Sequence, residues 1–497
     1  MSKKLINMQC NPLIRKIRTQ HSIFSIYSHL KDHPFSFLLE SALESRDIGR
    51  FSFMGIDPYL IFKSKKDHII MDWISFQNTI KGNPFLVLRE ILDDFSIKDT
   101  DLPLPFIGGA VGYFSYDLKD FNERLVDRAL DDTRLADSLL CLYDCIAAFD
   151  HLKQEFFVVS TGFPAKGREN LYRKKARMEN LINTIKAADR MFIEEVPDLR
   201  FESAYSGTET VPKSNFTRNN YIKAVKAAKE YIKAGDIYQV NLSQRFKAKV
   251  DVKAFDLYAA LRIINPAPFA AFLNFGDVKI ISASPERFLK KESRSVQTRP
   301  IKGTRPRGKN KTDDIKLKKE LLGSIKDRAE NLMIIDLERN DLGRICEFGT
   351  VKVMEFMKCE EYATVFHLVS TIAGKLKKRT GAIDCLISCF PGGSITGAPK
   401  IRSMEIIEEL EPVKRSIYTG SIGYISFNDN MDTSIAIRTL VMKGGDVYFH
   451  AGGGIVYDSE PEKEYQETLD KAKAMIEVTR LSGEVNPQLI KQRWHTA

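Results

Sequence analysis

The sequence lacks the segments that place a protein in or across a membrane. No run in the 497 residues approaches the about 18 apolar residues of a transmembrane helix. The basic start, MSKKLINMQCNPLIRKIRTQ, has no apolar core of the kind that a secretory signal needs. We therefore expect a cytoplasmic protein that does not bind membranes.

Cysteine is scarce, and its spacing gives no sign of metal or disulfide chemistry. The seven cysteines form no CxxC pair, and no histidine lies close enough in sequence to suggest a zinc site. An odd number without a paired pattern favours buried, reduced thiols.

Long blocks of like charge are also absent, and arginine does not interleave with aromatic residues. The net charge of +10 favours anionic partners, but without these features nucleic acid is the weaker choice. Hydrophobic residues at 43% and charged residues at 28% are typical of a globular protein, and the length suits two or three domains.

Strand-like runs alternate with turns in the first part of the chain, which ends in a charged helix over 166–188. The polar stretch 196–215 contains prolines and has no periodicity, so we expect it to link an N-terminal region, 1–195, to a second domain, 216–480. A tail, 481–497, would follow. Antiparallel hairpins interspersed with helices predict the α+β class.

The second domain opens with a helix that Thr217 caps and Gly235 ends. In the next segment, IYQVNLSQRF, alternation predicts a strand with Tyr238, Val240 and Leu242 on its core face. A long helix is expected from about Pro461. Turns are predicted at Gly276-Asp277, Gly444-Gly445-Asp446 and Gly452-Gly453-Gly454.

Glu286 and Lys302 are sixteen residues apart across an expected strand–turn–strand segment. A carboxylic acid can protonate a leaving hydroxyl, and a neutral lysine can attack an electrophilic carbon. Both need a partly desolvated pocket that shifts their pKa values. By composition alone, two surface residues beside a loop fit the pattern as well.

Two predicted helices carry acidic faces. Asp327 and Glu330 share one face, and Glu464, Glu467 and Lys471 lie together on the final helix. That acidic face is expected to point away from a buried stripe made of Tyr465, Leu469, Ala472 and Ile476. Such carboxylates form either a solvated surface or a site for a hard cation such as Mg²⁺.

Glycines recur near residues suited to binding anions. The segments GGSITGAPK, YTGSIGY and GGG allow backbone amides to approach an anion, and Arg438 can clamp a carboxylate. Each of these signals alone is also typical of ordinary turns.

Together these segments resemble the chorismate-utilising enzymes, a family that includes anthranilate synthase component I, aminodeoxychorismate synthase component I, and the isochorismate and salicylate synthases. The similarity runs from LLESA near Leu39, through GRFSFMG and GGAVGYFSYDL, to about Met475. It implies an α+β fold of mostly antiparallel sheets in a core sandwich with helices outside, in which 216–480 is the chorismate-binding catalytic domain.

Two positions indicate a branch of that family. Gln239 falls where the isochorismate and salicylate synthases carry a lysine that activates water, which disfavours a water-using reaction. Lys302, in PIKGT, falls where anthranilate synthases generally carry alanine, and where aminodeoxychorismate synthases carry a lysine thought to attack C2 of chorismate. The resemblance thus implies formation of 4-amino-4-deoxychorismate for para-aminobenzoate and folate synthesis, with anthranilate synthase as the alternative.

The resemblance also implies roles for individual residues. Glu286 would be the general acid, Lys302 the nucleophile, and His367 a catalytic histidine near the ring. A Mg²⁺ ion would lie at Glu330, Glu464 and Glu467, and tryptophan at Glu40 and Ser41. The substrate-binding residues would be Gln239, Gly303, Thr304, Ser394, Tyr418, Arg438, Gly452, Gly453, Gly454 and Lys471.

The source of ammonia is expected to be a partner. No cysteine lies in a Gly-x-Cys-x-Gly elbow, so the resemblance implies a separate glutaminase subunit. Two other classes of function remain as alternatives: a basic nucleic-acid-binding protein and an inactive relative kept for ligand binding. The second is disfavoured because every matched position carries a competent residue.

Overall fold

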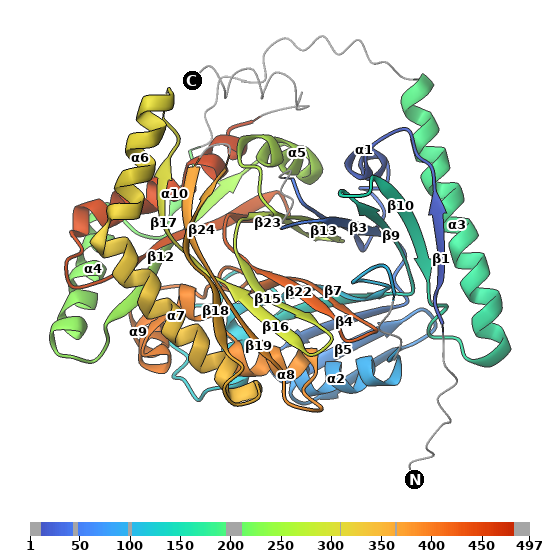
Figure 1. Ribbon diagram of the computed structural model, residues 1–497, viewed down its shortest axis with the longest axis horizontal. Coiled ribbons are helices and arrows are strands. Elements are labelled where there is room, and N and C mark those ends of the chain that lie inside the picture. The colour runs from blue at the N-terminus through green and yellow to red at the C-terminus, as the bar shows by residue number, and fades with distance from the viewer. Residues whose placement is uncertain are drawn as a thin grey trace.

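The computed structural model describes residues 11–42, 48–97, 102–194, 211–308, 310–362 and 365–481. Their strands form two large sheets that lie face to face, with helices around the outside (Figure 1). Every pairing between named strands of these sheets is antiparallel. The predicted α+β class and the sandwich of antiparallel sheets are confirmed.

The first sheet contains the glycine-rich strand and IYQVNLSQRF. Its order is β1 (Leu13–Ile17), β10 (Glu155–Ser160), β9 (Cys145–Asp150), β3 (Phe51–Gly55), β2 (Ser36–Glu40), β13 (Phe269–Phe275), β14 (Val278–Ser284), β23 (Thr439–Lys443), β24 (Asp446–Ile455), β12 (Gln239–Lys249) and β11 (Lys213–Ser214), and β20 (Gly397–Ala398) also pairs with β12.

The second sheet contains the strands that follow Glu286. Its order is β17 (Ile301–Pro306), β19 (Val365–Lys375), β16 (Ser295–Arg299), β15 (Arg287–Glu292), β22 (Met431–Ile435), β21 (Ser421–Ser426), β7 (Gly109–Phe114), β8 (Ser138–Tyr143), β4 (Leu60–Lys65), β5 (His68–Trp73) and β6 (Gln77–Lys81), and β18 (Lys352–Glu361) also pairs with β19. Each sheet thus combines strands from both ends of the chain.

Helices cover the outer faces and edges of the sheets (Figure 1). They are α1 (Ile23–Ser28), α2 (Pro84–Asp94), α3 (Gly167–Glu194), α4 (Arg218–Lys233), α5 (Ala254–Ile264), α6 (Lys311–Gly323), α7 (Ile325–Ile345), α8 (Ala382–Cys389), α9 (Lys400–Leu410) and α10 (Pro461–Thr479), with 3-10 turns η1 (Tyr116–Phe121) and η2 (Gly393–Ile395). Within the described ranges, no helix is long and apolar enough to cross a membrane.

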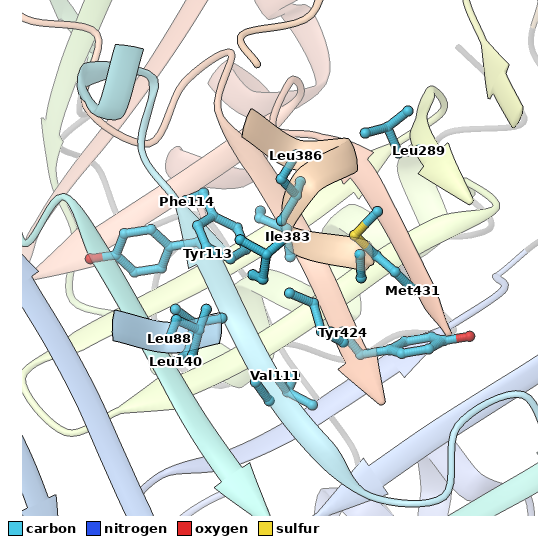
Figure 2. Packing of buried hydrophobic residues seen from close by; sticks show 14 of the residues in the cluster. Leu88, Val111, Tyr113, Phe114, Leu140, Leu289, Ile383, Leu386, Tyr424 and Met431 are labelled. Carbon is cyan, nitrogen blue, oxygen red and sulfur yellow. The ribbon is translucent and has the colours of Figure 1, made fainter. Parts of the chain in front are cut away.

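Aromatic side chains fill the space between the sheets. The Phe53 ring of the first sheet lies 5.4 Å from the Tyr424 ring of the second, and both pack against Phe106. Figure 2 shows the second sheet packing against helices, with Leu88 of α2 and Leu386 of α8 beside its strands. Burying such side chains contributes about 1.5–3 kcal/mol each.

The local predictions of the second domain are largely confirmed. Thr217 caps α4, and its hydroxyl accepts a hydrogen bond from the Asn220 amide. The hairpins at Gly276 and Gly444 join β13 to β14 and β23 to β24. The linker 196–215 lies largely outside the described residues, as does most of the tail 481–497, and the domain boundaries stay predictions.

Three local predictions were wrong. Gly452, Gly453 and Gly454 form no turn but lie within β24, paired with β12. Tyr238 precedes β12 and is 73% exposed, because the strand begins one residue later.

The third error concerns the face of α10 that is buried. Ala472 is buried as predicted, but Tyr465, Leu469 and Ile476 are only half-buried, whereas Glu464 is 3% exposed. The reason is that α10 packs against β24, α4 and α5 at once, which buries a wider arc than an apolar stripe indicates.

Candidate active site

Glu286 and Lys302 meet at one residue, Ser394 of η2. The Ser394 hydroxyl donates a hydrogen bond to Glu286 Oε1 at 2.5 Å, and Lys302 Nζ donates to the Ser394 carbonyl oxygen at 2.9 Å. The three residues come from separate stretches of chain. The fold thus brings together the predicted acid and the predicted nucleophile.

Burial shifts both groups toward their neutral forms. Glu286 is 5% exposed, and burial raises the pKa of its carboxyl, although the Ser394 hydrogen bond and the charge of Lys302 oppose the shift. Burial lowers the pKa of the Lys302 amine, although the nearby carboxylates of Glu330 and Glu286 act to raise it. A neutral acid can donate a proton, and a neutral amine can attack carbon.

A β-bulge in β17 lies at Lys302 and changes the direction of its side chain. The register between β17 and β19 shifts between Ile301 and Thr304, and Gly303 has a φ of 85°, which favours glycine. Bulges of this kind redirect a side chain out of the strand's alternation. A Cβ at Gly303 would lie 3.1 Å from Asp327, so the position has no room for a side chain. Its contact with substrate stays a prediction.

The three predicted metal ligands gather from two helices. Glu330 of α7 accepts a hydrogen bond from Gln239 Nε2 at 3.3 Å. One carboxylate oxygen each of Glu464 and Glu467, from α10, lies 3.2 and 3.1 Å from the position of a Cβ on Gly453. These two oxygens therefore converge beside β24.

Two lysines stand among these carboxylates. Lys326, which the sequence reading missed, places Nζ 3.9 Å from Glu330 and 3.7 Å from Glu464. Lys471 Nζ lies 2.6 Å from Glu467. Burial alone would raise the pKa of Glu467, but Lys471 lowers it.

Glu464 has a buried oxygen that bears on the metal prediction. Its Oε2 has no hydrogen-bond partner among the described residues, and burial together with Glu467 raises the pKa of its carboxyl. Among the described residues, no three histidine, cysteine or carboxylate side chains are arranged so that they could hold a metal ion by themselves. A hard cation that takes a few carboxylates and completes its shell with water and substrate oxygens fits this donor set.

His367 lies on β19, the strand that pairs with the strand of Lys302, as a neutral side chain. On β19 it is directly opposite Thr304 of β17, and its Nδ1 lies 2.9 Å from the Thr304 hydroxyl. Burial, with the charge of Arg438 adding to it, lowers the pKa of His367 to about 3. The imidazole is therefore uncharged at neutral pH.

Tyr418 and Arg438 are both fixed by neighbours that sequence reasoning did not identify. The Tyr418 ring stacks on His450 with centroids 4.8 Å apart. Arg438, at a φ of 49°, donates from Nη1 to Asn265 Oδ1 at 2.8 Å. Asn265 follows the last residue of α5, and no local pattern links it to Arg438, 173 residues away in the sequence.

The three glycines of β24 create room for polar groups. A Cβ on Gly454 would lie 2.2 Å from Gln239 Nε2, and one on Gly452 would lie 2.6 Å from the Leu242 carbonyl oxygen. Lys471 Nζ donates to the Gly452 carbonyl oxygen at 3.0 Å. Glycine is therefore needed here because neighbouring groups approach the strand closely, and not because the chain turns.

Glu40 lines a cavity of about 280 Å³ between the two sheets. The Glu40 carboxylate is engaged there: it accepts hydrogen bonds from Tyr258 at 2.6 Å and Arg262 at 2.7 Å. Ser41 lies beside Gly49, which lines the cavity. Aromatic walls come from Phe51, Phe53, Phe269 and Tyr424.

Comparison with known proteins decides the family. The model of the chorismate binding enzymes matches residues 17–477. The chain belongs to the chorismate-binding enzyme family. The family assignment made from the sequence motifs is therefore confirmed.

Named relatives fall in two groups within the family. Anthranilate synthase component 1 of Acetivibrio thermocellus is 39% identical over 93% of each chain. Aminodeoxychorismate synthase component 1 of Escherichia coli is 40% identical over 91% of this chain and 94% of its own. Identity alone does not separate the two activities.

Solved structures of family members share the fold. Anthranilate synthase component I from Streptococcus pneumoniae superimposes with a TM-score of 0.74 at 34% identity, over 87% of this chain and 93% of its own. An isochorismate synthase from Escherichia coli gives 0.67 at 18% identity, which supports the fold only.

Proposed function

We propose that this family member is an aminodeoxychorismate synthase, which converts chorismate and ammonia to 4-amino-4-deoxychorismate. The observation that carries the proposal is the shared contact of Lys302 and Glu286 with Ser394. A lysine amine whose pKa is lowered by burial, beside a carboxyl whose pKa burial raises, is suited to covalent displacement of a hydroxyl. Alanine at the lysine position, the pattern expected of anthranilate synthases, offers no such nucleophile.

The displacement takes two steps. Lys302 Nζ bonds to C2 of chorismate, the ring double bonds shift, and the C4–O bond breaks as Glu286 gives its proton to the departing hydroxyl, which leaves as water. Ammonia then bonds to C4 on the reverse shift, and the C2–N bond to Lys302 breaks, which restores the neutral amine. The new C4 ammonium group gives one proton back to Glu286, which completes the cycle. The enolpyruvyl group remains, so the sum is chorismate and ammonia to product and water.

The surrounding residues hold the substrate in this proposal. Arg438, fixed by Asn265, and the amides of the β24 glycines would bind the substrate carboxylates. Glu330, Glu464 and Glu467 would hold Mg²⁺, whose charge would bind the ring carboxylate. Neutral His367 can accept or donate a hydrogen bond near the ring, but it offers no positive charge to stabilise the reacting groups.

Two further ligands belong to the proposal. A separate glutaminase subunit supplies ammonia, consistent with relatives that are named as component 1 of a synthase. The cavity between the sheets binds tryptophan, because its aromatic walls suit an indole ring.

Anthranilate synthase is the second candidate. It is favoured by the larger number of anthranilate synthases among the similar proteins, at 37 to 40% identity. The deciding experiment identifies the product made from chorismate, Mg²⁺ and ammonium, with and without the lyase that releases para-aminobenzoate. Lyase-dependent para-aminobenzoate supports the proposal, and fluorescent anthranilate without the lyase overturns it.

A further inference from the structure

Glu338 of α7 lies directly behind the turn that holds the reactive pair. It is 2% exposed, and its Oε1 accepts a hydrogen bond from the Gly393 amide at 3.1 Å. A Cβ on Gly393 would lie 3.2 Å from the same oxygen, so the turn is pressed onto α7 here. The next residue, Ser394, contacts both Glu286 and Lys302.

The charges around Glu338 are not balanced. Asp341, one helical turn further on, is 1% exposed and forms an ion pair with Lys400 of α9. No described cation forms an ion pair with Glu338. Its Oε2 and the Oδ1 of Asp341 are buried and lack a hydrogen-bond partner among the described residues.

Glu338 and Asp341 are two buried carboxyls beside a single ammonium group, that of Lys400. They are expected to share one proton, because a second buried negative charge without a cation costs free energy. The proton belongs on Glu338, since Asp341 has the lysine. The pKa of Glu338 is accordingly raised to about 7, by burial first and then by the charges of Asp341 and Glu286, while Lys400 and the Gly393 amide oppose the shift.

We propose that Glu338 is a positioning residue: it fixes the Gly393–Ile395 turn and, through Ser394, holds Glu286 and Lys302 in their reacting geometry. The inference rests on the proposed role of Glu286 as the acid. Glu338 acts here as an acceptor for the Gly393 amide, so an uncharged side chain that still accepts this hydrogen bond should replace it.

The test replaces Glu338 in two ways and follows chorismate consumption at a fixed concentration of free ammonia across neutral and alkaline pH. Glu338→Gln keeps an acceptor for the Gly393 amide but cannot ionise. We expect its kcat at neutral pH within about twofold of the parent, because the hydrogen bond that orients the turn is kept. Glu338→Ala removes the acceptor, and we expect kcat to fall about tenfold or more as the turn loosens.

Glu408→Gln is the matched control, because Glu408 is another buried carboxyl, 6% exposed, but pairs with Lys119 instead of the η2 turn. It should lower the melting temperature and leave kcat within about twofold of the parent. A fall of kcat in Glu338→Gln as large as in Glu338→Ala, or parental kcat in Glu338→Ala, overturns the inference. Glu286→Gln separates the two proposals. If this variant is inactive, the proposed role of Glu286 as the acid stands; if it is fully active, that role and the present inference both fail.

Discussion

The Ser394 hydroxyl donates a hydrogen bond to Glu286 Oε1 across 2.5 Å, and Glu286 is only 5% exposed. This hydrogen bond opposes the rise in pKa that burial causes in the Glu286 carboxyl. Ser394 therefore orients the proposed acid and also limits the rise of its pKa, so that Glu286 can still release its proton.

Ser394→Ala should slow the reaction and change its pH dependence. A hydrogen bond to the charged form lowers a carboxyl pKa, so its loss raises the pKa of Glu286 further and moves the alkaline limb of kcat/KM to higher pH. We expect kcat to fall about tenfold at neutral pH because the acid is no longer oriented. Ser394→Thr keeps the hydroxyl and should behave like the parent; equal loss in both variants would contradict this role.

Lys302→Ala should remove the covalent step. We expect at least a ~10²-fold loss of aminodeoxychorismate formation, together with some anthranilate-type product if ammonia attacks C2 directly. Chromatographic product analysis with kcat measurement checks both effects. Lys375→Ala, on the exposed end of neighbouring β19, is the control and should leave rate and product unchanged. Parental turnover and product in Lys302→Ala would disprove the assignment.

Local patterns predicted the elements well because capping and alternation are properties of short segments. Thr217 and the hairpin glycines acted as expected. Gly452–Gly454 did not, because the need for glycine there comes from Gln239 and the Leu242 carbonyl oxygen on the adjacent strand, which sequence spacing does not reveal.

The same limit applies to the site. Family motifs indicated Glu286 and Lys302 before the structure joined them at Ser394. Asn265 and Glu338 carry no such motif, since their importance comes from contacts across the fold with Arg438 and Gly393. The buried position of Glu464 likewise depends on three neighbouring elements, not on the pattern of α10.

Glu330→Gln and Glu467→Gln should each raise the Mg²⁺ concentration needed for half-maximal activity or abolish activity. Removing one carboxylate charge weakens a site built from few protein ligands. Glu462→Gln is the control, since Glu462 lies on the same helix as Glu467 but its side chain is 60% exposed and pairs with Arg218. Activity measured as a function of Mg²⁺ concentration compares the two variants with the control and the parent chain. Full activity of the parent chain in EDTA would exclude the metal site.

Tryptophan should bind in the cavity between the sheets. Ala271, in β13, lines that cavity and is 2% exposed, so Ala271→Leu extends a side chain into it. We expect calorimetric titration to detect tryptophan binding in the parent and at least tenfold weaker binding in Ala271→Leu. Unchanged chorismate consumption without tryptophan shows that the variant is folded. Equal binding by both proteins would place tryptophan elsewhere.

The chain alone should make product from ammonia but not from glutamine. Ammonia is the attacking species, because the ammonium ion has no free electron pair. At constant total ammonium, activity should therefore rise with pH toward the ammonium pKa, until loss of the Glu286 proton reverses the trend. Addition of the cognate glutaminase subunit should give glutamine-dependent activity near neutral pH, where free ammonia is scarce. Product formation from glutamine by the purified chain unaided would contradict the expected partner, and catalytically inactive glutaminase subunit serves as the control.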